Sequence, residues 1–258
     1  MPIDTAQIQV FVLVFLRVAS ALSVLPVFGH GAFPPIGKAG LSAALSLLLV
    51  PALALQLPPV GGTTLEFFLL GIREVLCGVL LGLAGQFVFW AVEVAGQLIG
   101  FQAGFSIITS IDPNTDAQST VLTQVYNLVA LLVFLSIDGH HVMLRAIADS
   151  LRAVPIGGLN VGAPLTEWAV FMAKGVLADG VRMAAPIMVT LLLTDVGLGI
   201  LVRVAPTMNV FVLGFPLKVA VALILVSLTL GAVMSVFTFQ FADFTRHMPS
   251  FLKLLSVP

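Results

Sequence analysis

The sequence is poor in charge. Only 9% of its 258 residues are Asp, Glu, Lys or Arg, whereas soluble domains carry roughly 25%. Hydrophobic residues make up 59% of the chain, and the mean hydropathy is +1.15. These values exclude most soluble enzyme classes and predict an integral membrane protein. The net charge of −1 provides no broad basic face, so a nucleic-acid partner is not expected.

Cysteine and catalytic motifs are also scarce. Cys77 is the single cysteine, so no intramolecular disulfide can form. The sequence has no P-loop, no HExxH pattern and no nucleophile–base–acid set, so we expect no enzyme activity and no cofactor. His140 and His141 follow Asp138 and Gly139, but adjacent histidines on a helix point about 100° apart. We therefore expect Asp138 to cap a helix, and we predict no metal site.

The apolar residues gather into about six blocks, several of them too long for one ordinary span of about 20 residues. This pattern predicts an all-α membrane protein with several long or kinked helices. The blocks cover residues 8–28, 38–57, 65–99, 121–137, 168–204 and 208–241, with a mildly amphipathic tail over residues 242–258.

One polar stretch interrupts this apolar chain. Residues 101–124 read FQAGFSIITSIDPNTDAQSTVLTQ, with no Lys or Arg. Asp112, Pro113 and Asn114 form a turn signal within it. A stretch of this kind between two spans is either an extramembrane connector or an inserted element that blocks or lines a pore.

Nine charged residues fall inside the apolar blocks, where each would cost roughly 2.5–3.5 kcal/mol at the bilayer centre. Asp179 and Arg182 are three residues apart and share a helical face, whereas the adjacent Arg73 and Glu74 do not. The charges could form an ion relay, pair with partner subunits, or belong to helices outside the lipid. The nine are Arg17, Arg73, Glu74, Glu93, Lys174, Asp179, Arg182, Asp195 and Lys218.

Small residues and prolines mark special points in the helices. Gly78, Gly82, Gly85, Gly96 and Gly100 form ridges that allow close helix packing. The segment Gly214-Phe215-Pro216, followed by Lys218, predicts a kink beside a charge within an apolar block.

These residues together resemble a known family. GILVRVAPTMNVFVLGFPLKVAV, over residues 199–221, resembles the late signature of the FliR/SctT family of flagellar and virulence type III export-gate proteins. The polar stretch, the run LVALLVFLSIDGHH and the tripeptide at residues 155–157 are similar to that family in the same order. The family more often has Gln at the position of Thr207 and Pro at that of Thr120.

The resemblance implies a noncatalytic subunit of a secretion channel. It implies one integral membrane domain over residues 1–258, in which residues 1–160 are FliP-like and residues 165–258 form a FliQ-like helical hairpin and tail. The implied partners are FliP-like and FliQ-like subunits, an FlhB-like switch protein and an FlhA-like export protein. The implied location is the bacterial inner membrane, at a flagellar basal body or injectisome base, where unfolded substrates pass.

The resemblance also assigns roles to the unusual residues. The stretch over residues 101–124 projects into the lumen and helps to plug the pore, with Phe101, Phe105, Ile107, Ile108 and Ile111 as its apolar bulk and Asp112, Pro113 and Asn114 as its turn. The implied intersubunit or kink residues are Arg17, Arg73, Glu74, Glu93, Asp179, Arg182, Asp195, Arg203, Gly214, Phe215, Pro216 and Lys218.

Two other functions stay open on the residues alone. An autonomous proton-coupled secondary transporter would use Glu93 or Asp195 as its proton carrier. A scaffold without a role in a pore is the third possibility.

Overall fold

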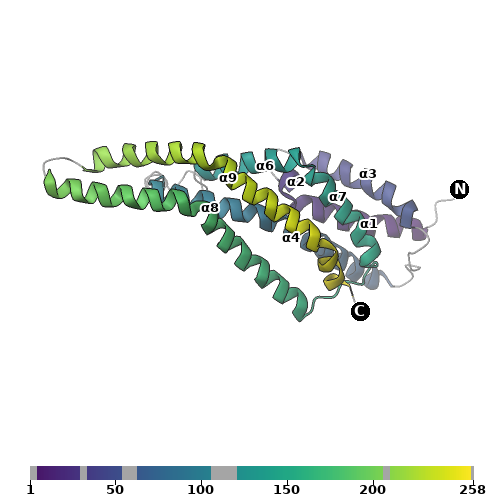
Figure 1. Ribbon diagram of the computed structural model, residues 1–258. Coiled ribbons are helices and arrows are strands. Elements are labelled where there is room, and N and C mark those ends of the chain that lie inside the picture. The colour runs from purple at the N-terminus through teal and green to yellow at the C-terminus, as the bar shows by residue number, and fades with distance from the viewer. Residues whose placement is uncertain (1–4, 30–33, 54–62, 106–120, 206–209, 257–258) are drawn as a thin grey trace. The chain divides into compact units, whose positions relative to one another are not determined.

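The computed structural model describes residues 5–29, 34–53, 63–105, 121–205 and 210–256, which are almost entirely helical (Figure 1). The predicted all-α membrane architecture is confirmed, and the one strand-like contact among the described residues is an isolated bridge between Leu159 and Ser256. The helices are α1 (Thr5–Val24), α2 (Pro26–Gly29), α3 (Pro35–Leu53), α4 (Thr64–Ala103), α6 (Val121–Ser136), α7 (Gly139–Ala153), α8 (Ala163–Val204) and α9 (Val210–Leu255).

Four of the described helices are long and apolar enough to cross a membrane: α1, α4, α8 and α9. The bent pair of α6 and α7 provides a fifth candidate span, and α3 is a shorter apolar helix. With 42 residues, α8 is about 63 Å long, roughly twice the 30 Å of a hydrocarbon core. The overlong blocks in the sequence are therefore single long helices.

The start of α4 is fixed by a capping box in a segment that composition alone assigns to a loop. The backbone N–H of Thr63 donates to Glu66 Oε2 at 3.0 Å, and the backbone N–H of Glu66 points back to Thr63 Oγ1 at 3.4 Å. This reciprocal arrangement satisfies donors that the first turn of a helix leaves free.

The chain divides into two compact units. Unit 1 comprises residues 1–87, 135–171 and 241–258, and unit 2 comprises residues 88–134 and 172–240. The boundaries divide α4, α8 and α9, so that each unit receives one part of each of these helices, and the last two residues of α6 fall in unit 1.

Within unit 1, α1 packs against α3 and against the first half of α4. The predicted glycine ridge makes the second contact possible. A Cβ atom on Gly78 would collide with Ser20 Oγ and with the backbone oxygen of Arg17, and one on Gly82 would lie 2.6 Å from Val24 Cβ. The role of these glycines in close helix packing is therefore confirmed.

Within unit 2, the second half of α4 packs against α6, α8 and α9. Phe89 meets the ring edges of Phe134 and Phe237 at centroid distances of 5.3 and 5.2 Å. A Cβ atom on Gly96 would lie 2.7 Å from Thr123 Cα, and one on Gly180 of α8 would lie 2.6 Å from Val94 Cγ1. These two glycines therefore allow α6 and α8 to pack closely against α4.

Replacing Gly78 with alanine should destabilise the protein by about 3 kcal/mol, because backbone atoms of α1 would have to move to admit the new methyl group. Gly175 on α8 is the matched control, since outside its own stretch of helical backbone no described atom lies within 4 Å of a Cβ built there. Gly175→Ala should stabilise the helix by about 0.5–1 kcal/mol. Denaturant unfolding in detergent checks both values, and equal effects of the two substitutions would contradict the packing argument.

Candidate functional site

The most buried charges in unit 1 form a bidentate ion pair between α1 and α4. Arg17 Nε lies 2.6 Å from Glu74 Oε2, and Arg17 Nη2 lies 3.0 Å from Glu74 Oε1. The side chains are 0% and 1% exposed. A planar guanidinium matches a carboxylate in this way, which makes Arg the suitable cation for a buried pair.

The same arginine also reaches the end of α7. Arg17 Nη1 donates to the backbone oxygens of Ser150 at 3.0 Å and Val154 at 2.9 Å. Ser150 lies in the last turn of α7 and Val154 is its C-cap; Ser150 O also accepts from the backbone N–H of Val154 at 2.8 Å, so Arg17 is a second donor to that oxygen. Arg17 therefore joins α1, α4 and α7 through one side chain.

The adjacent residues Arg73 and Glu74 both bind the turn at Gly157, which their spacing in the sequence does not predict. The backbone N–H of Gly157 donates to Glu74 Oε1 at 2.9 Å, and Arg73 Nη1 donates to the backbone oxygen of Gly157 at 2.9 Å. Gly157 has a φ of +76°, and a Cβ there would collide with Leu70. The two charges thus hold one turn by its donor and its acceptor, at a position that requires glycine.

The second polar cluster lies in unit 2, between α4, α8 and α9. Lys218 Nζ lies 2.8 Å from Asp195 Oδ1, and Gln102 Nε2 donates to Asp195 Oδ2 at 3.0 Å. The side chains of Lys218 and Asp195 are 20% and 36% exposed. Asp195 lies on α8 and Lys218 on α9, and Figure 1 shows the end of α8 and the start of α9 running antiparallel.

Gln102 belongs to the turn that opens the polar stretch. There α4 ends in a Schellman motif. The backbone N–H of Phe105 donates to Gly100 O at 3.0 Å, that of Gly104 donates to Phe101 O at 3.1 Å, and Gly104 has a φ of +93°. Phe101 is 70% exposed and Phe105 is half-buried. Ile107, Ile108, Ile111, Asp112, Pro113 and Asn114 lie outside the described residues.

The other predicted charges remain on helix surfaces. Arg182 Nη1 lies 3.2 Å from Asp179 Oδ1, so the pair that the spacing predicts is present. Glu93 accepts a hydrogen bond from Gln97 Nε2 at 3.3 Å, one turn along α4. Lys174 and Arg203 are exposed on α8.

The predicted kink segment lies inside α9. Gly214 is buried, Phe215 is half-buried and Pro216 is exposed. The helix continues from Val210 to Leu255, so Pro216 does not end it. Because Pro216 is the seventh residue of α9, it removes the hydrogen bond to the backbone oxygen four residues earlier.

The polar clusters have no recognisable catalytic constellation among the described residues. Their members are an arginine–glutamate pair, a lysine–aspartate pair and backbone groups, all of which are mutually satisfied. Such clusters position helices and loops.

Comparison with known protein families identifies the family of this chain. Residues 8–244 match the model of the bacterial export proteins, family 1. The chain belongs to this family. The match covers every described helix in whole or in large part, and both polar clusters fall within it.

Curated relatives are similar to this export family member over most of their length. The flagellar biosynthetic protein FliR of Bacillus subtilis (strain 168) is 34% identical over 250 residues, which is 96% of each chain. The FliR of Pectobacterium carotovorum subsp. carotovorum is 36% identical over 217 residues, covering 84% of this chain and 82% of its own. The FliR of Escherichia coli (strain K12) is 33% identical over 214 residues, covering 82% and 80%. The resemblance to the FliR/SctT family is thus confirmed.

Sequence reasoning about this export protein missed Gln102 and the carbonyl partners of Arg17. Gln102 lies in a stretch with many amides and hydroxyls, so nothing distinguishes it before the fold is known. The carbonyls of Ser150 and Val154 belong to the backbone, which no residue pattern marks. Pro155, Gly157 and Gly158 lie within four residues of one another, a composition typical of turns.

Proposed function

We propose that this chain is a FliR-like, noncatalytic subunit of the flagellar protein export gate in the bacterial inner membrane. The single observation that carries the proposal is the similarity to FliR proteins at 33–36% identity over four fifths or more of the chain. The partners would be FliP-like and FliQ-like subunits, with FlhB-like and FlhA-like proteins nearby. Unfolded substrates would pass through the shared pore.

The exposed apolar surface of the hairpin supports assembly with other subunits. Only 17% of the span in α8 and 22% of that in α9 are buried within the chain, against 56% in α4. Glycines at positions 197, 199 and 231 face open space, whereas those at 78, 96 and 180 pack within the chain. Small residues on an apolar helix face allow a neighbouring helix to approach closely. In this proposal α8 and α9 are the FliQ-like hairpin, and residues 1–160 are the FliP-like part.

The Gln102–Asp195–Lys218 cluster supports a role for the polar stretch in closing the pore. The cluster holds the last turn of α4 against the hairpin at the point where the stretch begins. Gly104 then redirects the chain out of the helix. The stretch over residues 101–124 would be the plug, with its apolar residues excluding water and its Ser, Thr and Asn residues tolerating it when the pore opens.

The test is purification of the tagged full chain from its native membrane, followed by identification of the proteins that accompany it. We expect several copies of two small membrane proteins. Gly197→Leu should reduce their recovery, because the added side chain stands where a partner helix would approach, whereas Gly197→Ala should reduce it less. The melting temperature of the chain alone should not fall, since outside its own stretch of helix no described atom lies within 4 Å of a Cβ built at Gly197 and replacing a helical glycine favours the helix.

The second candidate is the autonomous proton-coupled transporter. The contacts of Asp195 argue against a role as proton carrier, because its carboxylate pairs with Lys218 and accepts a hydrogen bond from Gln102. Glu93 retains some support, since no cation pairs with it within the described part of the chain. A chain that purifies without partners and moves a solute in liposomes, with the flux lost in Glu93→Gln, would replace the export proposal.

A further inference from the structure

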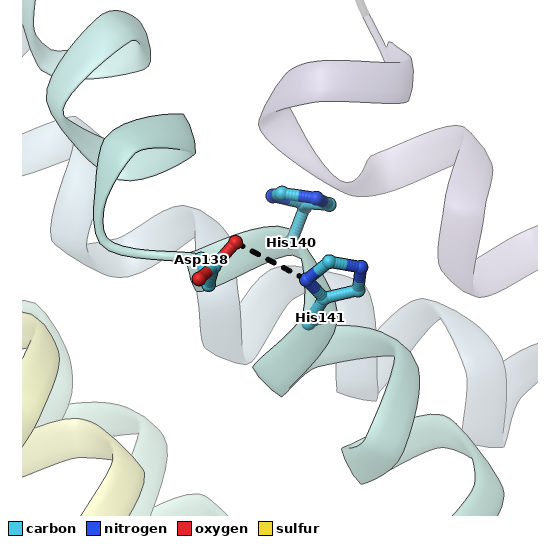
Figure 2. A group of neighbouring side chains, drawn as sticks. All are labelled: Asp138, His140 and His141. Atoms are coloured by element: carbon cyan, nitrogen blue, oxygen red, sulfur yellow. Dashed lines mark hydrogen bonds and ion pairs between the residues drawn. The ribbon is translucent and has the colours of Figure 1, made fainter.

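Asp138, His140 and His141 lie together at the start of α7 (Figure 2). One ligand atom from each residue lies within 4.8 Å of those of the other two. The two imidazole rings have centroids 4.1 Å apart and an interplanar angle of 35°. The separation of about 100° between successive residues on a helix therefore does not keep these rings apart, because rotation about the side-chain bonds brings them to the same side.

The Asp138 carboxylate is available as a ligand. Asp138 stands at the N-cap of α7, but its side chain makes no capping hydrogen bond. Its Oδ1 faces His141 Nδ1 at 3.2 Å instead, and the two side chains are 73% and 60% exposed. Asp138 also has a φ of 57°, and it is the one described residue other than glycine with a positive φ. The carboxylate therefore contacts His141 and leaves the N–H groups that an N-cap usually satisfies without a side-chain acceptor.

His140 provides an independent indication that a ligand belongs here. Its Nδ1 atom is buried and has no hydrogen-bond partner within the part of the chain that the structure describes. A buried ring nitrogen without a partner is costly, and metal coordination is one way to satisfy it.

We propose that Asp138, His140 and His141 bind one divalent first-row transition metal ion, with Zn²⁺ as the preferred occupant. Two imidazoles and one carboxylate suit zinc and its neighbours better than Mg²⁺ or Ca²⁺, which prefer oxygen ligands. Four ligands around zinc lie about 3.3 Å apart, given metal–ligand distances of about 2.0 Å. The observed 4.8 Å must shorten, and rotation of the exposed Asp138 and His141 side chains provides this. Water would complete the coordination.

The bound ion would fix the first turn of α7. Asp138 lies outside the helix and His140 and His141 lie within it, so one ion would join the turn to the helix. This goes beyond the export proposal and does not depend on it.

The test is titration of the metal-stripped full chain in detergent, purified through a tag without histidine, with ZnCl₂ alone. We expect one Zn²⁺ per chain with a Kd below about 100 μM. Substitution by Co²⁺ should give the visible absorption of a site with nitrogen and oxygen ligands. His140→Ala and His141→Ala should each weaken binding by at least about tenfold, and zinc should raise the melting temperature of the unaltered chain but not of these variants.

His247→Ala is the matched control. His247 Nδ1 lies 3.5 Å from Asp243 Oδ2 on α9, so it has the same pairing as His141 with Asp138. It belongs to no group of three ligands among the described residues. Binding should be unchanged in this variant. The absence of saturable binding, or a loss in His247→Ala equal to that in His140→Ala, would overturn the proposal. The Co²⁺ spectrum of the unaltered chain decides the case if a variant fails to fold.

Discussion

Replacing Arg17 with methionine should lower the free energy of unfolding by about 3–5 kcal/mol, because it leaves the Glu74 carboxylate buried without its cation. The loss is a large part of the 5–15 kcal/mol that stabilises a typical protein. It also removes the donor to the carbonyls of Ser150 and Val154. Denaturant unfolding of the purified chain in detergent measures the change.

Two further variants separate the charge from the packing. Arg17→Met with Glu74→Met should recover more than half of the loss, since an apolar pair of similar volume often replaces a buried ion pair well. The backbone N–H of Gly157 would still lose its acceptor, so recovery should be incomplete. Arg182→Met is the control, because Arg182 is 78% exposed and its pair should contribute less than about 0.5 kcal/mol. Similar losses for Arg17→Met and Arg182→Met would refute the argument.

Deleting residues 107–115 should make the closed export complex permeable to ions while leaving its assembly intact. In the proposed gate this segment contains the apolar side chains that exclude water, and a hydrophobic constriction closes a pore by dewetting it. The anchor at Gln102 lies before the deletion and would remain. Conductance of purified complexes in planar bilayers measures the effect.

A second variant tests the apolar seal without shortening the chain. Replacing Ile107, Ile108 and Ile111 with serine should also open a leak, whereas replacing Thr109 and Ser110 with alanine should not. If assembled complexes stay impermeable after both the deletion and the serine substitutions, the stretch is not a plug. The proposal would then be limited to the assembly of this chain with other subunits.

The helices of this protein could largely be predicted from hydropathy, but the extent of α9 could not. The apolar block ends near Phe241, where Asp243 and Arg246 follow, and the sequence predicts a mildly amphipathic tail over residues 242–258. The helix continues to Leu255 because its apolar residues recur at helical spacing. Phe244, Met248, Phe251, Leu252 and Leu255 are all buried within unit 1.

Charge pairs within one helix could be predicted from the sequence, but pairs between helices could not. Asp179 and Arg182 could be paired from their spacing, since neighbours three residues apart share a helix face. Arg17 and Glu74 are 57 residues apart, and Asp195 and Lys218 are 23 apart. No local pattern joins such residues, because their contact depends on how the helices pack. The roles of these charges toward partner subunits stay predictions.

The Arg17 network also has a consequence for how the protein is made. Arg17 leaves the ribosome first, 57 residues before Glu74 and 137 before the carbonyl of Val154. At about 5–20 residues per second, about 7–27 s pass before the last of these partners has been made. Until Glu74 has been made, α1 holds a charge without its counter-ion, which lipid disfavours. The complete set of contacts of Arg17 therefore forms only after α7 has been made, and truncations that end before Val154 should be less stable in the membrane than the full chain.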